Sequence, residues 1–147
     1  MGNKFRGFSN SEIVELYKYL CIYEGVIKNI GSQKELMTTY PNLKELEILR
    51  SSFACSKCTR NYLSSVGILS LNNLVSMTSS RSSILLSFLN HLRNSIAHGL
   101  IEREGGYVHF SDYLLDNKIK RLSANGKIKS SVTFKIIQII IDNVDIS

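Results

Sequence analysis

The most regular hydrophobic pattern in the chain lies between residues 84 and 98. Its apolar positions recur every three or four residues, which is the spacing of one face of an α-helix. These positions are Leu85, Phe88, Leu89, Leu92 and Ile96. A Ser-rich stretch, 79–83, precedes them and can cap the free N–H groups of a helix, while Gly99 is a typical C-terminal stop. The pattern therefore predicts an amphipathic helix that ends at His98 and Gly99.

Three polar residues of this helix lie off the apolar stripe. At about 100° per residue, measured from the first apolar position, Arg93 falls at about 80°, Asn94 at about 180° and His98 at about 220°. Asn94 and His98 are thus neighbours on the face opposite the stripe. We expect all three side chains to point away from the core of their own subunit. His91, at about 240°, is expected beside His98 in a groove or interface rather than in catalysis.

Helical spacing also appears before and after this segment. The earlier helices are predicted at 9–30, at 32–40, and from 42 to about 62 or 63. The first two open with Ser and Glu at the spacing of a capping box. Residues 64–83, rich in Ser and Asn, are expected to form a loop with one helical turn at 71–77. A last helix is expected after Ser130 or Ser131, which would cap it; its Ile content also suits a strand, but its apolar positions follow the longer helical period.

The segment after Gly99 alternates with period two instead. Residues 100–104 and 107–110 flank Gly105-Gly106, which is a strong signal for a two-residue β-hairpin. We expect this hairpin to pack against the end of the preceding helix, where Arg103 or His109 could approach the polar residues. His109 is a second candidate for acid–base chemistry, although a histidine in a strand is more often structural.

Together these elements predict a single domain, residues 1–147, of mainly all-α class: a bundle of four or five helices with a small β-hairpin before the C-terminal helix. The chain is 44% hydrophobic and 20% charged, which is enough apolar material for one core. No apolar run is long enough to span a bilayer, and no secretory leader is apparent. With an odd count of three cysteines, these features predict a cytoplasmic protein in a reducing compartment.

The pair Cys55-Ser-Lys-Cys58 falls within the third predicted helix. Such a pair can bind zinc or take part in redox chemistry, but a tetrahedral zinc site needs four ligands and no second pair follows nearby. Nor does the pair lie where a strand meets a helix, as thioredoxin-like motifs do. We therefore predict ordinary free cysteines, no metal site and no cofactor.

The formal net charge is +6 and the sequence pI about 9.3, which favours a polyanionic partner. Six basic residues between 118 and 135 are not interrupted by an acidic one. They are Lys118, Lys120, Arg121, Lys127, Lys129 and Lys135. This segment is either solvated and partly disordered, or it contacts phosphates without regard to base sequence. Asn125-Gly126 within it is expected to be a turn, and residues 112–117 are expected to turn away from the hairpin.

The trio Arg93, Asn94 and His98 suits cleavage of a phosphodiester without a metal ion. Arginine is permanently cationic and its fork matches phosphate oxygens. Histidine titrates at about pH 6.5 and can exchange a proton, while an amide can fix a ring tautomer or a phosphate. The alternative is a solvated helix end, where a histidine cation interacts with the helix dipole.

The string Arg93-Asn94-x-x-x-His98, followed by Gly99, resembles the signature of the HEPN superfamily, which comprises helical proteins of nucleic-acid defence and toxin systems. That signature is an Arg, often with Asn directly after it, then a short spacer and a His. The resemblance implies a helical bundle in which two subunits pair so that both motifs meet in one cleft.

The resemblance further implies a metal-independent endoribonuclease whose products carry a 2′,3′-cyclic phosphate and a 5′-hydroxyl. His98 would act as general base toward the ribose 2′-OH or as general acid toward the 5′-oxygen. Arg93 would stabilise charge on the phosphorane, and Asn94 would orient His98 or a phosphate oxygen. The residues expected to contact RNA are His91, Arg103, Lys118, Lys120, Arg121, Lys127 and Lys129.

The same resemblance suggests a biological setting. Small members of the superfamily are often toxins or abortive-infection effectors in phage defence, and some are restrained by a nucleotidyltransferase-like antitoxin. Two alternatives stay open. One is a non-catalytic module of the same fold that binds RNA or a partner protein, and the other is a helical adaptor with no nucleic-acid role.

Overall fold

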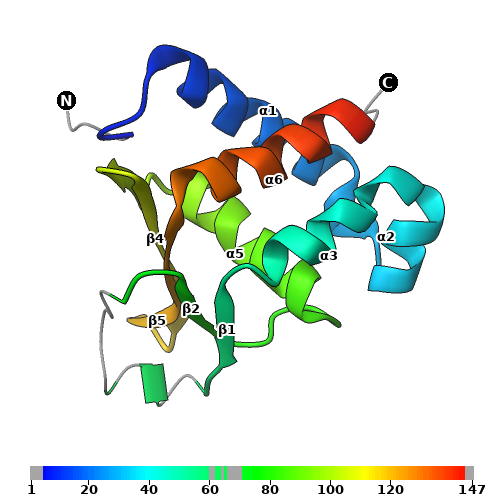
Figure 1. Ribbon diagram of the computed structural model, residues 1–147. Helices are drawn as coiled ribbons and strands as arrows, with labels where there is room; N and C mark the ends of the chain where they lie inside the picture. The colour runs from blue at the N-terminus through cyan, green and yellow to red at the C-terminus, as the bar shows by residue number, and fades with distance from the viewer. Residues whose placement is uncertain (1–4, 60–61, 64, 66–70, 145–147) are drawn as a thin grey trace.

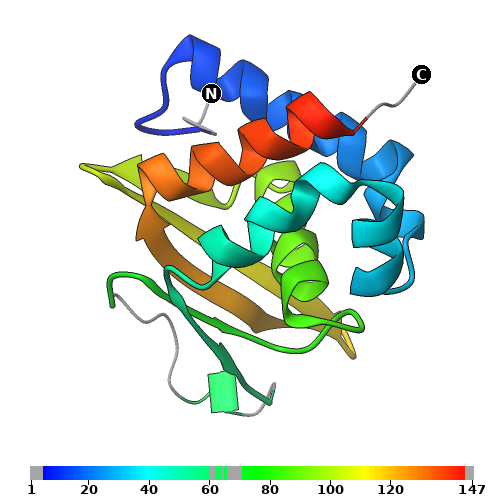
Figure 2. The same cartoon turned by 45° about the vertical axis from the view of Figure 1, so that its right-hand side comes forward.

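The computed structural model describes residues 5–59, 62–63, 65 and 71–144. In this part of the chain a layer of helices packs against a five-stranded mixed sheet (Figures 1 and 2). The fold is therefore α/β, and the predicted all-α helical bundle is wrong.

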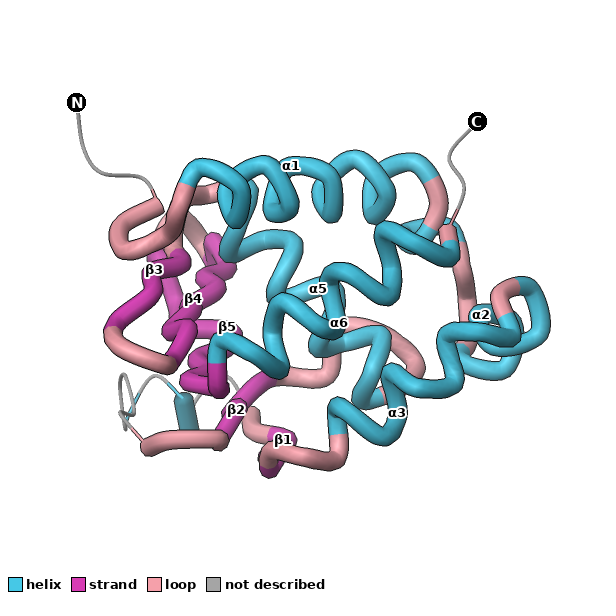
Figure 3. The backbone as a smooth tube through the Cα atoms, turned by 45° about the horizontal axis from the view of Figure 1, so that its top comes forward, coloured by secondary structure: helices cyan, strands magenta, loops and turns pink. Residues whose placement is uncertain are grey.

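The helices are α1 (Asn10–Gly25), α2 (Gln33–Thr39), α3 (Glu45–Arg50), α5 (Ile84–Ala97) and α6 (Ser130–Asn143), with 3₁₀ turns at Ile27–Asn29 and Pro41–Lys44. The strands are β1 (Ala54–Lys57), β2 (Leu74–Met77), β3 (Ile101–Glu104), β4 (Tyr107–Asp116) and β5 (Ile119–Lys129). Their order is β1-β2-β5-β4-β3, with β1 and β2 parallel and every other neighbouring pair antiparallel. Figure 3 shows the strands gathered on one side of the molecule, with α2 far from them.

The amphipathic helix predicted before His98 is confirmed as α5, which packs against α1, α3, β2 and β4. Every residue of its apolar stripe is at most 1% exposed. Phe88 stands at its centre, with ring centroids 5.2 Å from Phe53 and 6.0 Å from Phe110. On its other side the Tyr19 hydroxyl of α1 donates to the Leu89 carbonyl at 2.6 Å. This packing makes α5 the centre of the fold.

Three further sequence predictions are confirmed. The first helix has the full Ser9/Glu12 capping box, although it ends at Gly25 and a 3₁₀ turn follows. The hairpin around Gly105-Gly106 joins β3 to β4, with Glu104 opposite Tyr107. The last helix is α6, and its isoleucines 136, 137, 139 and 140 are buried, but its N-cap is Lys129 and not a serine.

The predicted third helix is too long, because it ends at Arg50 and β1 begins at Ala54. Cys55 therefore lies on a strand and Cys58 just after it, not in a helix. The predicted helical turn at 71–77 is also wrong, since Leu74–Met77 forms β2. Both strands are only four residues long, too short to display a period, and their ladder partners are distant in sequence. The rest of the loop predicted at 64–83 lies partly outside the residues that the structure describes.

Asn125-Gly126 is not a turn but the buried middle of β5. A Cβ added to Gly126 would lie 2.5 Å from the Phe110 ring, so this glycine is required by the aromatic side chain packed over it. The turn occurs instead at Asn117 and Lys118, which both have positive φ and connect β4 to β5. The turn expected at 112–117 is therefore wrong, and the β4–β5 hairpin also includes part of the basic segment that begins at Lys118.

Within the described ranges, no helix combines the length and the apolar character that crossing a bilayer requires.

Candidate functional site

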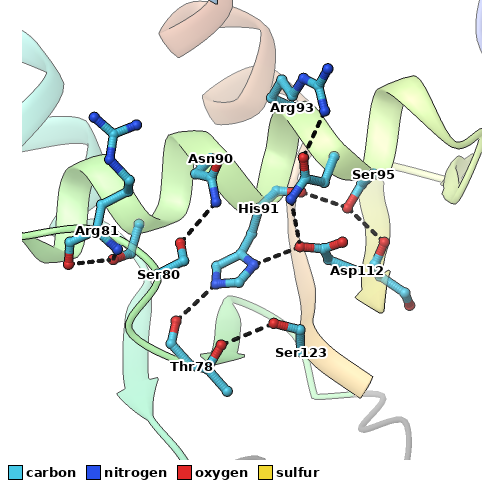
Figure 4. A network of polar contacts seen from close by, with 12 residues as sticks. Thr78, Ser80, Arg81, Asn90, His91, Arg93, Ser95, Asp112 and Ser123 are labelled. Carbon is cyan, nitrogen blue, oxygen red and sulfur yellow. Dashed lines mark hydrogen bonds and ion pairs between the residues drawn. The ribbon is translucent and has the colours of Figure 1, made fainter. Parts of the chain in front are cut away.

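A buried ion pair between His91 and Asp112 joins α5 to β4 (Figure 4). The two side chains are 1% and 2% exposed. The ring Nδ1 lies 2.8 Å from Asp112 Oδ2, and Nε2 lies 2.8 Å from the Thr78 carbonyl oxygen. A carbonyl can only accept, so Nε2 must carry a proton, and a second proton lies between Nδ1 and the carboxylate. In this arrangement the ring offers no lone pair to a substrate.

Asn94 and Arg93 extend this group along α5. The Asn94 Nδ2 donates to Asp112 Oδ2 at 3.0 Å, and Arg93 Nη1 donates to Asn94 Oδ1 at 2.9 Å. Arg93 also forms an ion pair with Glu24 at the end of α1. A hydrogen bond from Lys28, together with the charge of Arg93, lowers the pKa of Glu24. A continuous polar chain therefore runs from α1 through α5 to the sheet.

Strand alternation puts Asp112 on the face of β4 that packs against α5, and a β-bulge lies directly beside it. Asp112 pairs with Ala124 but Tyr113 pairs with Leu122, so Ser123 is an extra residue in the ladder. Such a bulge changes the direction of nearby side chains. The Ser123 hydroxyl lies 2.9 Å from the Thr78 hydroxyl, and the Thr78 amide donates to the Ser123 carbonyl. These contacts fix the loop after β2 against β5, directly beside His91.

His98 is the C-cap of α5 and is exposed. Its amide donates to the Asn94 carbonyl at 3.0 Å. Its ring makes no hydrogen bond or ion pair with the part of the chain that the structure describes. The His98 side chain therefore points away from the core of its own subunit, as expected. The same expectation does not hold for Asn94, which bonds to Asp112 on the sheet of its own chain, because α5 lies between that sheet and α1.

A pocket of about 300 Å³ adjoins this network. Its walls come from the end of β1, the loop after β2, helix α5 and the β4–β5 hairpin. The lining side chains are Cys58, Thr59, Thr78, Ser79, Ser80, Asn90, His91, Asn94, Asp112, Leu114 and Ser123. No lysine or arginine occurs among these described lining residues, so the pocket is polar but not cationic.

The basic residues expected to contact RNA are distributed over several elements. Lys118 and Lys120 are exposed near the tip of the β4–β5 hairpin, and Arg121 follows them. Lys127 and Lys129 lie at the other end of β5, about 23 Å and about 30 Å from Lys120 at the rise of a strand. Their separation means that they do not form one compact patch.

Three other candidates have partners within the chain. Arg103 on β3 forms an ion pair with Glu12 of α1. His109 has its Nε2 3.0 Å from the Asn125 amide nitrogen and its Nδ1 3.7 Å from Glu102. Strand alternation puts His109 on the sheet face opposite Asp112. His91 is buried, so its expected contact with RNA has no support from this arrangement.

Asp112, Thr78 and Ser123 are site residues that the sequence analysis did not identify. A signal for Asp112 exists, since the alternation of Val108 and Phe110 continues to position 112 and puts a carboxylate on the apolar face of the strand. Thr78 and Ser123 carry no such signal, because sheet pairing alone brings them together.

Within residues 5–59, 62–63, 65 and 71–144, no three His, Cys, Asp or Glu side chains are grouped so that they could hold a metal ion. Cys21, Cys55 and Cys58 are all free. Burial raises the pKa of the Cys55 thiol, which makes it less reactive than an ordinary cysteine.

Comparisons with models of known protein families, with characterised proteins and with solved structures give no match to this chain.

Proposed function

We propose that this protein is a metal-independent endoribonuclease that uses Arg93, Asn94 and His98. The observation that supports it most is the arrangement at the end of α5. Arg93 and Asn94 are held by a hydrogen-bond chain that ends at the buried Asp112, while His98, one turn beyond Asn94, keeps an exposed ring without a partner among the described residues. An ordered cation and an exposed imidazole are the two kinds of group that metal-independent phosphodiester cleavage uses.

The proposed reaction uses these side chains, a second imidazole and the 2′-hydroxyl of the RNA. The His98 imidazole takes the proton of the ribose 2′-OH, and the 2′-oxygen attacks the adjacent phosphorus. Arg93 stabilises the negative charge on the phosphorane oxygens, and the Asn94 amide orients the phosphate. The 5′-oxygen then leaves with a proton from a second imidazole. The products are a 2′,3′-cyclic phosphate and a 5′-hydroxyl.

The second imidazole would come from another copy of the chain. Arg93 and His98 are five residues apart, which is about 140° around a helix and about 7.5 Å along it. Arg93 also turns toward Glu24 of α1. One motif therefore does not surround a phosphate by itself, and the proposed cleft is completed by a second copy. A toxin or phage-defence role, with restraint by a nucleotidyltransferase-like partner, is the further part of this proposal that depends on the HEPN resemblance.

The test is cleavage of mixed RNA in EDTA by the wild type, Arg93→Ala and His98→Ala. We expect each substitution to lower the rate by about a hundredfold or more, because each removes a group that acts in the transition state. His109→Ala is the matched control, since it removes a histidine from the other face of the sheet. Equal rates for all four proteins would reject the assignment of the site.

The ion pair between Arg93 and Glu24 favours a second candidate, a non-catalytic module that binds RNA or a partner protein. In that case Arg93 mainly attaches α1 to α5. RNA binding by the wild type, with no cleavage in the same samples, would identify this alternative. Its affinity should fall steeply with salt if phosphates are the ligands.

A further inference from the structure

The pocket of about 300 Å³ beside α5 has no role in the reaction described above. On α5, Asn90, Asn94 and His98 follow each other at intervals of four residues and therefore share one face of the helix. Asn90 and Asn94 line the pocket, and His98 comes one turn later. The pocket thus lies next to the place where the proposed function puts the scissile phosphate.

The described walls of the pocket offer no lysine or arginine to an anionic ligand. The charged groups among its described lining residues are His91 and Asp112, which form one ion pair with no net charge. None of these lining residues is a lysine or arginine that could balance the negative charge of a phosphate. A neutral ligand that forms hydrogen bonds fits these walls better than a charged one.

The remaining lining groups supply hydrogen bonds in several directions. The Asn90 amide donates one N–H to Ser80 at 2.9 Å and accepts from the Tyr23 hydroxyl at 3.0 Å. Its second N–H and the hydroxyl proton of Ser80 have no acceptor among the described residues. The hydroxyls of Thr78 and Ser123 bond to each other, and only one of them donates in that bond. Donors are therefore left for a ligand.

Leu114 gives the pocket one apolar wall. It lies where the β4–β5 hairpin extends beyond its neighbours, since β3 pairs only with residues 107–110 of β4 and β2 only with 124–127 of β5. A ligand with a flat apolar face and a polar edge would match a leucine wall opposite amides and hydroxyls. An unpaired nucleobase has this shape, and proteins recognise single-stranded RNA by enclosing such bases.

We propose that this pocket binds one unpaired nucleobase of the RNA, next to the phosphate on which His98 acts. The inference takes its link to RNA from the proposed function, but the recognition itself uses groups outside the proposed catalytic trio, except for Asn94. It predicts that binding depends on the base and not on a phosphate.

The test is titration of the wild type with adenosine, guanosine, cytidine and uridine, followed by calorimetry or by amide chemical shifts. At least one nucleoside should bind with a Kd of about 0.1–1 mM, which is ordinary for a ligand of this size. Its 5′-monophosphate should bind no more than about twofold tighter, because the described lining residues include no lysine or arginine. D-ribose alone and inorganic phosphate should not compete.

Two adjacent leucines provide a matched pair of variants. Leu114→Ala removes the apolar wall and should weaken nucleoside binding about fivefold or more. Leu115→Ala should leave it unchanged, because Leu115 is 77% exposed and does not line the pocket. Both side chains lie on the surface of the hairpin, so neither variant should fail to fold.

The proposal is overturned if no nucleoside binds, if phosphate or ribose competes, or if both leucine variants weaken binding equally. Cleavage of RNA without nucleoside binding would overturn the pocket proposal and leave the ribonuclease intact. Nucleoside binding without cleavage would support the pocket and reject the ribonuclease. The two proposals therefore fail separately.

Discussion

Asp112 is a carboxylate at a position where the strand pattern places apolar side chains. Val108 and Phe110 precede it on the same face of β4 and are at most 1% exposed. The cost of burying its charge is offset by hydrogen bonds from His91 and Asn94. The carboxylate therefore fixes how α5 sits on the sheet, and through Asn94 it also orients Arg93.

Asp112→Ala should lower the free energy of unfolding by about 3 kcal/mol, because His91 and Asn94 lose their shared acceptor in a buried place. Urea denaturation followed by circular dichroism measures this change. His109→Ala should cost less than about 1 kcal/mol, since that side chain is partly exposed. Similar losses in the two variants would mean that the buried pair has no special part in stability.

Tyr19 is the fully buried phenol of α1. Burial, and to a lesser extent the neighbouring Tyr23, raises the pKa of Tyr19 well above its ordinary value of 10.0. Above about pH 10 the unfolded chain therefore holds fewer protons than the folded one, and the free energy of unfolding falls as pH rises.

The substitution Tyr19→Phe should make this fall less steep, because phenylalanine does not titrate. Denaturation of both proteins at pH 9 and pH 11 gives the two slopes. Lysines also titrate in this range, and the difference between the proteins removes their contribution. Identical slopes would contradict the account of Tyr19.

At the scale of elements, α1, α5 and the β3–β4 hairpin were predictable from the sequence, whereas β1 and β2 were not. The apolar stripe of α5 and the capping box of α1 consist of residues that are three or four positions apart, so local spacing identifies both. In contrast, β2 pairs with a strand some fifty residues later, Leu74 with Lys127, and four residues display no period. A segment of this kind becomes a strand through long-range pairing, which its own residues do not encode.

The dipeptide Asn125-Gly126 illustrates the same limit. Its residues favour a turn, but both lie buried in β5, with Gly126 beneath the Phe110 ring. Gly126→Ala should lower the free energy of unfolding by about 1–3 kcal/mol, because its Cβ would overlap that ring. Gly106→Ala, at a hairpin position with open space around it, should change stability by less than about 1 kcal/mol. Equal effects in thermal or urea unfolding would contradict this packing.

At the scale of the whole molecule, the candidate site joins segments that are far apart in sequence. The residues on α5 could be found from the sequence because one helix carries them all. Thr78, Asp112 and Ser123 could not be assembled in this way, since the sheet brings the loop after β2 beside the β4–β5 bulge. The sequence thus predicts the proposed catalytic trio, and the fold adds the buried support and the pocket.

The arrangement of α5 also determines what a second copy would have to do. Arg93 turns toward α1 while His98 is exposed at the end of the helix. In the proposed reaction, a second copy therefore supplies the second imidazole. The ribonuclease proposal depends most on its chemistry, which is the metal-independent attack of the 2′-oxygen assisted by His98.

Analysis of the ends of the RNA fragments formed in EDTA tests this claim most directly. We predict that the wild type and His109→Ala leave 2′,3′-cyclic phosphate and 5′-hydroxyl ends, and that His98→Ala forms them at least about a hundredfold more slowly. Fragments that carry 5′-phosphates, or equal cleavage by His98→Ala, would contradict it.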